Sequence, residues 1–492
     1  MKDGRTISRC KRPARRRAFL FNLAAALVVL SPLAVAEIVA RLCVPAPPVN
    51  PEDPYVSFTG LRPLFVPDSA GTRFETARER FAAFRRQSFA ATKGPRTFRI
   101  FCLGGSTVQG HPYSVETSFP TWLTLSLRAA QPDTDWEVVN CGGVSYASYR
   151  LVPLMQELLQ HAPDLFVLCT GHNEFLEDRS YGRLKRTPRV LVRLHRAMLH
   201  LRTYSLADHW LSRKRGRHSG RTALSQDVQT KLDMEHGLES YHRDETWRQG
   251  TIEHFRRNIE TMVQMARAAG VPVVLMNPVS NLKDCPPFRS EFWAGLSEDQ
   301  KRRVADLMER AARLDWADAY GKIRLLEQAV TIDDRHAGLL YRIATCYLRL
   351  GRFAEARTWF LRAKEEDVCP LRMLESMREI VLDCANRHDV PLVDMRSLIE
   401  QQTADGISGN EWLLDHVHPS IEGHQLVADR LYQTMEEMEF VQTRDGWLAE
   451  RNTLRQGHLA SLNEAYYAHG QEHLRRLRRW SRGPADSEQP TP

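Results

Sequence analysis

The sequence predicts an α/β protein whose parallel sheet is covered by helices on both faces. Short apolar runs such as 165–169 (LFVLC) alternate along the chain with segments of helical periodicity. This alternation is typical of parallel strands joined by crossover helices. The stretches GGS, NCGG and TGHN each follow one of the apolar runs. Because ligands on such sheets bind beyond the carboxyl ends of the strands, we expect these stretches to meet at one site.

The individual elements follow from the same pattern. We expect strands at 97–103, 136–140, 165–169, 271–276 and 391–395. We expect helices at 117–130, 148–160, 252–269, 371–387 and 420–439, the third of which is closed by Gly270. At 492 residues the chain is too long for one ordinary core, so we expect two or three folding units.

The N-terminal segment has a basic run followed by an apolar run. Residues 1–17 carry eight Lys and Arg side chains and one acid, Asp3, and so hold +7 of the total charge of +8. The rest of the chain is therefore almost neutral, which argues against a nucleic-acid partner. Residues 18–36 carry no charge and are long enough to span a bilayer.

Residues 1–42 have two possible interpretations. In the first, 1–17 stays in the cytoplasm and 18–42 is a retained transmembrane anchor, which places the body of the protein in the periplasm. In the second, 18–42 is a signal peptide cleaved after the A-x-A pattern at 34–36, and the protein is secreted. The seven prolines of 45–70 predict a spacer, which we extend over 43–95.

Two segments interrupt the strand and helix alternation. Residues 180–226 hold twelve basic side chains and one acid, and predict a basic helical insert over 180–250. Its charge fits either a solvated helix face or contact with anionic headgroups or an acidic polymer. Residues 316–370 resemble one and a half tetratricopeptide repeats, with small and aromatic positions such as Ala344, Gly351 and Phe360. Because one and a half repeats are too few to be stable alone, we expect residues 316–370 to pack on the sheet domain.

A serine nucleophile and its partners can be picked out at the predicted strand ends. Ser106 follows the first strand in GGS, on a turn that opens a helix. A nucleophilic serine needs a base, and the base needs an orienting acceptor; the spacing of Asp415 and His418 lets one loop supply both. The Ser106 N–H, the Asn173 side chain and an N–H of the loop after Asn140 are candidate oxyanion donors.

Four sequence blocks carry a family resemblance. LGGSTVQG, VVNCGGVSYAS, TGHNEF and DHVHP occur in this order, and in them the chain resembles the SGNH/GDSL hydrolase superfamily. With the repeat insert, it also resembles a bacterial subgroup of membrane-anchored hydrolases fused to tetratricopeptide repeats. The resemblance implies a three-layer α/β/α, flavodoxin-like fold. It further implies that Ser106 is the nucleophile, His418 the base, Asp415 its orienting acid, and Ser106, Ser145 and Asn173 the oxyanion hole.

The blocks depart from the family pattern at three positions. The usual Asp before the nucleophile is Gly105, and Glu174 stands where Asp is usual. The position of the usual oxyanion glycine is Ser145, whose backbone N–H can still donate, with Gly143 as the alternative donor if the loop is shifted. The implied hydrolase domain lies in three parts, 96–179, 251–315 and 371–440, with a C-terminal helix and disordered tail over 441–492.

The predicted function is a serine esterase that cleaves an ester of an exported or envelope substrate. The alternatives are an O-acyltransferase on an exported polysaccharide that uses the same residues, and a non-catalytic scaffold that contains the repeats. The expected partners are an ester-bearing small molecule, lipid or polysaccharide, the membrane through the N-terminal helix, and a protein through the repeat hairpin. The nine cysteines form no CxxC pair, so we expect buried thiols, no metal site and no cofactor. His172, Arg150 and Arg372 are expected to be structural.

Overall fold

The computed structural model describes residues 31–32, 35–40, 53–179, 181, 203–204 and 221–482. The chain divides into two units, one of residues 1–50 and 182–219 and one of residues 51–181 and 220–492. In the first unit, the N–H and hydroxyl of Thr203 donate hydrogen bonds to the Glu37 carboxylate. Nowhere in the described ranges is there a helix long and apolar enough to cross a bilayer. Most of the predicted span at 18–42 and of the basic insert lies outside those ranges.

The second unit contains the predicted parallel sheet. Its strands are β5 (Thr97–Gly104), β6 (Asp135–Gly142), β7 (Leu165–Cys169), β9 (Val273–Asn277) and β10 (Leu392–Asp394). All neighbours are parallel, in the order β10-β9-β7-β5-β6. Numbered along the chain this order is 2-1-3-4-5, the flavodoxin-like order, whose switch point lies between β5 and β7.

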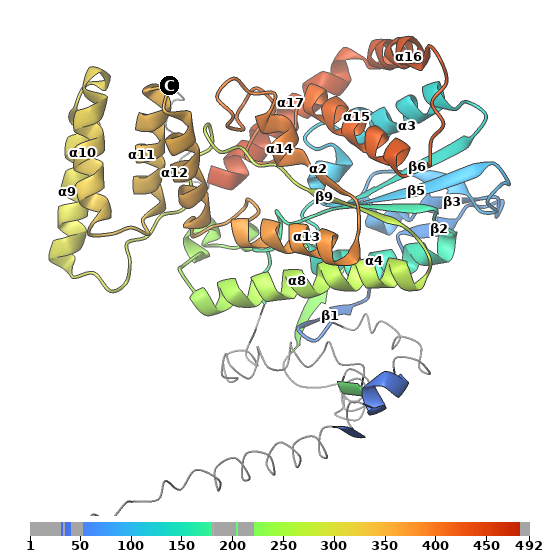
Figure 1. The fold of residues 1–492 in the computed structure, drawn as a ribbon, viewed down its shortest axis with the longest axis horizontal. Helices are drawn as coiled ribbons and strands as arrows, with labels where there is room; N and C mark the ends of the chain where they lie inside the picture. Colours follow the sequence, from blue (N-terminus) through green and yellow to red (C-terminus); the bar gives the residue numbers. More distant parts are fainter. Residues whose placement is uncertain are drawn as a thin grey trace, which may run out of the picture. The chain divides into compact units, whose positions relative to one another are not determined.

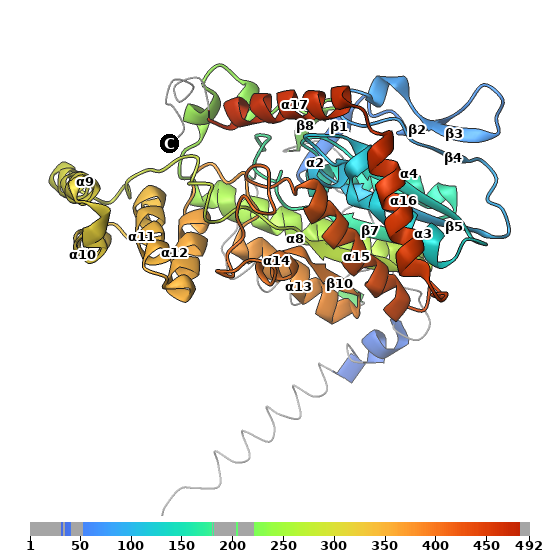
Figure 2. The same cartoon turned by 90° about the horizontal axis from the view of Figure 1, so that it is seen from above.

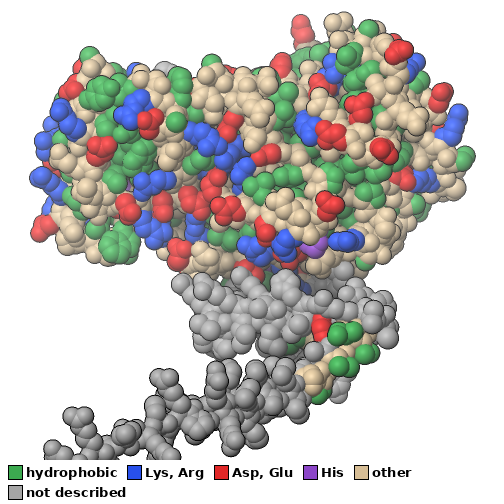
Figure 3. Space-filling view, viewed as in Figure 1, with side chains coloured by type: hydrophobic (Ala, Val, Ile, Leu, Met, Phe, Trp, Pro, Cys, Tyr) green, Lys and Arg blue, Asp and Glu red, His purple; other side chains and the backbone are tan. Residues whose placement is uncertain are grey.

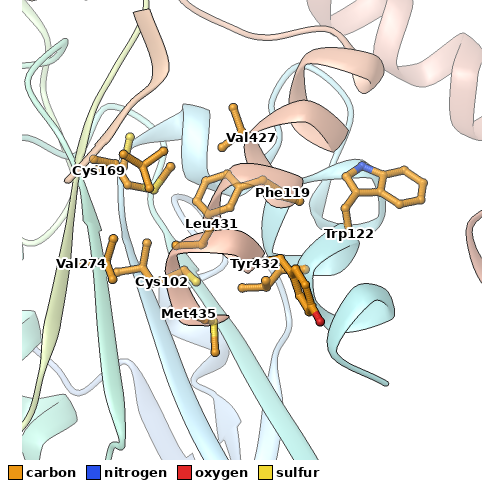
Figure 4. Close-up of a cluster of buried hydrophobic side chains, with 14 of the residues drawn as sticks. Cys102, Phe119, Trp122, Cys169, Val274, Val427, Leu431, Tyr432 and Met435 are labelled. Atoms are coloured by element: carbon orange, nitrogen blue, oxygen red, sulfur yellow. The ribbon is translucent and has the colours of Figure 1, made fainter. Parts of the chain in front are cut away.

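Helices cover both faces of this sheet, as expected (Figure 1). On one face lie α3 (Phe119–Ala130), α14 (Met395–Glu400) and α15 (Ile421–Glu437). Figure 4 shows apolar side chains of α3 and α15 against the strands, with Phe119, Leu431 and Met435 turned toward Cys102 and Val274. Successive strand residues point to opposite faces, so buried Phe101 faces the other layer.

The opposite layer is built from α4 (Ser148–Leu158), α8 (Glu245–Ala268) and α13 (Glu375–His388). Helix α4 contacts β5, α13 contacts β9, and α8 packs against both helices. Helix α8 begins seven residues before the start predicted at 252, because the Asp244 side chain caps it by accepting the Trp247 N–H.

The spacer prediction is wrong for residues 53–95, which belong to the folded unit. They contain β1 (Val56–Thr59), which pairs with β8 (Thr222–Ser225), and an antiparallel sheet of β2 (Phe65–Pro67), β3 (Arg73–Thr76) and β4 (Ser88–Ala90). Buried Arg99 donates to the Ala90 carbonyl and to Glu137, and Glu157 accepts the Leu64 N–H. The prolines of this segment therefore lie in turns and short edge strands, where no ladder hydrogen bond is lost.

The repeat insert forms two helical hairpins. They consist of α9 (Glu298–Arg313), α10 (Ala319–Val330), α11 (Ala337–Arg349) and α12 (Phe353–Glu365), which share a core that includes Leu307, Ile343 and Phe360. The exposed side of this part of the molecule carries intermixed acidic and basic side chains (Figure 3). The second hairpin and helix α10 correspond to the one and a half repeats that we predicted within 316–370. The structure adds α9, which lies in the range 251–315 that we had assigned to the sheet domain.

The hairpins are anchored to the sheet domain through α12, as expected. Arg357 pairs with Glu400 of α14 at 2.9 Å, and Lys364 pairs with Glu375 of α13 at 2.7 Å. Burial would raise the pKa of Glu375, but the Lys364 and Arg396 cations lower it to about 2. The Glu375 carboxylate therefore stays ionised at neutral pH, and the two ion pairs fix α12 to both helices.

Two helices follow the sheet domain, where we expected one helix and a disordered tail. Helix α16 (Trp447–Ser461) packs on α3, and α17 (Glu464–Arg482) runs back across the unit (Figure 2). Residues 483–492 lie outside the described part of the chain. The remaining short elements are α2 (Ser106–Gln109) and the 3-10 turns Arg78–Arg80, Val115–Thr117, Leu159–His161, Lys231–Asp233, Gly237–Ser240 and Trp316–Asp318.

Candidate active site

Ser106 lies on a tight turn between β5 and α2. Strand β5 ends at Gly104, where an added Cβ would lie 2.1 Å from the Cys169 carbonyl oxygen of β7. Only glycine lets the two strand ends approach so closely. Ser106 is the first residue of α2 and is buried, and its Oγ lies 2.7 Å from His418 Nε2. This distance is within hydrogen-bond reach of a nucleophile and its base.

His418 and Asp415 come from a compact loop before α15. The loop is closed by a hydrogen bond from the Leu414 N–H to the His418 carbonyl. The Asp415 carboxylate accepts the N–H groups of Val417 and His418 at 2.8 and 2.9 Å. Its other oxygen lies 2.7 Å from His418 Nδ1. With a proton on Nδ1, the imidazole therefore donates to Asp415 and presents Nε2 as an acceptor to Ser106.

The electrostatics of this loop keep Asp415 ionised. Burial alone would raise the pKa of the carboxyl, but the neighbouring imidazoles of His418 and His416 and the hydrogen bonds it accepts hold that pKa well below its usual range. A permanent negative charge beside Nδ1 stabilises the imidazolium that forms when His418 takes a proton.

The backbone between β6 and α4 supplies the candidate oxyanion donors. The N–H groups of Gly143, Val144 and Tyr146 already donate to the carbonyls of Gly104, Ala83 and Gly143. Within the described residues, the N–H of Ser145 has no acceptor, and neither has that of Ser106. The positive φ of Ser145, 61°, sets it apart from its neighbours in this loop. This pattern favours Ser145 over Gly143 as the free donor.

Asn173 lies directly against the nucleophile turn. One hydrogen of its Nδ2 is donated to the Tyr146 carbonyl at 2.9 Å, which leaves the second hydrogen free. A Cβ built on Gly105 would lie 2.5 Å from this Nδ2 and 3.3 Å from the Tyr146 carbonyl oxygen. In this structure a side chain at position 105 would therefore collide with the Asn173 amide.

We expect Gly105→Ala to lower kcat for ester hydrolysis by about 10²-fold. The added methyl group would displace the Asn173 amide, and loss of one oxyanion donor costs about 10²- to 10³-fold in kcat. Steady-state assays with p-nitrophenyl acetate measure the effect. Gly457→Ala is the matched control, because an added Cβ there meets no atom within 4 Å. Unchanged kcat in Gly105→Ala would exclude Asn173 as a donor.

Glu174 has a structural role in the same loop. Its carboxylate accepts the N–H and the hydroxyl of Ser148 at 2.7 and 2.9 Å, and so caps α4. Burial raises the pKa of Glu174, and the hydrogen bonds from Ser148 and the charge of Arg179 oppose that rise. The Glu174 side chain, which is longer than the usual Asp, thus joins the TGHN loop to the start of α4.

The other polar residues singled out in the sequence make buried contacts away from Ser106. His172 accepts the Met373 N–H through Nδ1, and burial lowers its pKa well below the usual value. Arg150 pairs with Glu177, and Arg372 pairs with Asp367. These contacts agree with the structural roles that we expected.

His416 and His424 lie close to the site but outside the Ser106–His418–Asp415 chain. His416 Nδ1 is 3.5 Å from Asp415 Oδ1, beyond a good hydrogen bond, and burial lowers its pKa to about 4. His424 accepts the Phe119 N–H, and burial lowers its pKa to about 3. Both imidazoles are therefore neutral near pH 7.

No cluster in the described part of the chain has the side chains to hold a metal ion. The cysteines near the strand ends are buried: burial raises the pKa of Cys169 to about 12 and raises that of Cys102 further. Thiols in this state are poor nucleophiles and poor metal ligands.

Sequence reasoning missed two neighbours of the site. His111, after α2, has its ring centroid 5.2 Å from that of His418. Its ring also stacks on His473 of α17. Neither histidine belongs to a recognisable motif, and only the folded chain brings them to the base.

Comparisons with known proteins identify a tetratricopeptide repeat in the chain but do not assign its activity. The tetratricopeptide repeat family matches residues 312–368. No curated protein sequence matches the chain significantly. Among solved structures, the acetylxylan esterase Axe2 from Geobacillus stearothermophilus is 11% identical, with 72% of this chain and 99% of that chain covered and a TM-score of 0.32. The lipase/acylhydrolase from Enterococcus faecalis is 12% identical, with 71% and 100% covered and a TM-score of 0.31. Likeness of this degree cannot assign an activity, so the function is inferred from the side chains of the site.

Proposed function

We propose that the protein is a serine esterase that uses Ser106, His418 and Asp415. The observation that carries this proposal is the buried hydrogen-bonded chain from Ser106 Oγ to His418 Nε2 and from His418 Nδ1 to Asp415, with both distances at 2.7 Å. A serine held in this way beside free backbone N–H groups at a strand end has the parts needed for acyl transfer.

The proposed reaction has two steps. His418 takes the proton of Ser106 as Oγ attacks the ester carbonyl, and the tetrahedral oxyanion is held by the N–H groups of Ser106 and Ser145 and by Asn173. His418 then gives its proton to the leaving alcohol, which departs and leaves an acyl-Ser106. Water attacks this ester with His418 again as base, and the free acid and Ser106 are restored.

Labelling with a fluorophosphonate tests the nucleophile directly. We expect the full-length protein to be labelled at Ser106 alone, which peptide mass spectrometry would show, and to release p-nitrophenol from p-nitrophenyl acetate. A protein that neither reacts with the probe nor turns over the ester is not a serine esterase. Labelling without hydrolysis, together with acyl transfer to a glycan hydroxyl, would instead identify an O-acyltransferase.

A further inference from the structure

Residues 280–284, which follow β9, link the repeat hairpins to the loop that carries the base. We call these residues the linking segment, and residues 412–418 the base loop. The N–H of Asn281 donates to the carbonyl of His416 at 2.9 Å. His416 is the neighbour of Asp415 in the chain, so the linking segment is hydrogen-bonded to the backbone that holds the catalytic residues.

The backbone that leads into the base loop is joined to the same segment. The Ser408 carbonyl accepts the N–H groups of Leu282 and Lys283 at 2.9 and 3.3 Å. The side-chain amide of Asn281 donates to Asn410 at 2.9 Å. Ser408 and Asn281 are buried, so these hydrogen bonds are shielded from water. They fix the linking segment to the start of the base loop.

The other side of the linking segment belongs to the repeat hairpins. The side chain of Leu282 is buried in the core that the four repeat helices share, and so is that of Ile407, which precedes Ser408. The hydroxyl of Tyr341 in α11 donates to the Lys283 carbonyl at 2.5 Å. The core of the hairpins therefore contains the residue next to Asn281.

Charged side chains add to these contacts. The Lys283 ammonium lies 2.6 Å from Asp405 and 2.5 Å from Glu411. Burial opposes the charge of Lys283, but the two carboxylates raise its pKa. Arg372 donates to the Asn281 carbonyl at 2.9 Å. A displacement of the linking segment would therefore break several contacts at once.

The base loop differs from the other parts of the site in how it is supported. Ser106 and Asn173 follow β5 and β7, so the sheet itself fixes their positions. The chain between α14 and α15, which carries Asp415 and His418, contains no helix or strand. Its position therefore depends on contacts with neighbouring segments, among which the linking segment bonds to the loop and to its start.

His418 acts as a base only while its Nε2 stays within reach of Ser106, and a displacement of about 1 Å can cost about 10²-fold in rate. We propose that the repeat hairpins position the catalytic base, and that Asn281 and Leu282 are the positioning residues that hold the base loop in place. This inference rests on the proposed esterase function. It gives the hairpins a role in catalysis that requires no protein partner.

Two cavities in one core distinguish positioning from stability. Leu282→Ala and Leu326→Ala each remove a buried side chain from the core of the hairpins, and of the two only Leu282 lies on the linking segment. We expect both to lower the melting temperature by a similar amount. Well below that temperature, Leu282→Ala should lower kcat for p-nitrophenyl acetate by about tenfold or more with KM unchanged. Leu326→Ala should leave kcat unchanged, and Leu282→Met, which keeps the volume, should restore it.

Two tyrosine variants provide a milder comparison, which decides the matter if Leu282→Ala does not fold. Tyr341→Phe removes the hydroxyl bonded to the linking segment, and Tyr347→Phe removes a hydroxyl of the same helix that donates to Glu327 at 3.2 Å. We expect kcat to fall by about threefold in Tyr341→Phe, as the loss of one hydrogen bond implies, and to stay unchanged in Tyr347→Phe. Equal kcat within each pair of variants would overturn the inference, and so would a rise in KM alone.

Hydrogen exchange separates this inference from the proposed function, because it needs no activity. If the wild type neither reacts with fluorophosphonate nor hydrolyses the ester, amide exchange of residues 409–419 in the full-length protein still shows whether the hairpins hold the base loop. Exchange that is faster by about tenfold in Leu282→Ala but not in Leu326→Ala supports the positioning role. Equal exchange in the two variants excludes it.

Discussion

Ser106→Ala is expected to lower the rate of p-nitrophenyl acetate hydrolysis by at least about 10⁴-fold. The substitution removes the hydroxyl that lies beside His418, while the oxyanion donors and the binding surface remain and account for the residual rate. The melting temperature should stay close to that of wild type, because the lost hydroxyl contributes the single hydrogen bond to His418.

Ser461→Ala is the control for this variant. Ser461 is exposed at the end of α16, where its hydroxyl donates to the His458 carbonyl, and we expect full activity. Ester hydrolysis in Ser106→Ala within tenfold of wild type would show that the reaction uses another nucleophile.

Asp415→Asn is expected to lower kcat by about 10³- to 10⁴-fold with little change in KM. An amide at this position can donate to His418 Nδ1, which places the imidazole proton on Nε2 and leaves no acceptor for the Ser106 proton. The same change removes the charge that stabilises the imidazolium. The side-chain oxygen can still accept the N–H groups of Val417 and His418, so the loop should keep its shape.

Steady-state kinetics and the rate of fluorophosphonate labelling measure this effect. Both should fall together, because both need an activated Ser106. Asp299→Asn is the control: its side chain is 87% exposed on α9 and pairs with Arg302. A loss below tenfold in Asp415→Asn would mean that His418 is oriented by another group.

The sheet could be predicted because each of its strands can be recognised from a few neighbouring residues. Each strand is a short apolar run, and the strand 165–169 has the bounds that we predicted. The loop that joins Asp415 to His418 was predictable for the same reason, since their contact spans three residues. The structure brings Ser106, Asn173, Asp415 and His418 together as the sequence implied, and their catalytic roles stay predictions.

The features that were missed depend on contacts between distant segments. The carboxylate of Glu157 accepts the N–H of Leu64, 93 residues away, and this contact helps to fold a segment that reads as a proline-rich spacer. His473 is placed against Pro112 across 361 residues, and nothing in the composition of α17 indicates where it docks. The early start of α8 was a local miss, since Asp244 is a typical capping residue, and the helix predicted at 371–387 begins only at Glu375.

The separation of Ser106 and His418 by 312 residues has a consequence for the timing of synthesis. While the ribosome is still adding the repeat hairpins, the emerging chain already carries Ser106 but does not yet contain His418, the proposed base. A hydroxyl in that state is an ordinary alcohol with negligible reactivity toward esters. In the proposed mechanism, ester hydrolysis therefore begins only after the loop that carries His418 has been made and has folded onto the end of β5, and unfinished chains do not hydrolyse esters.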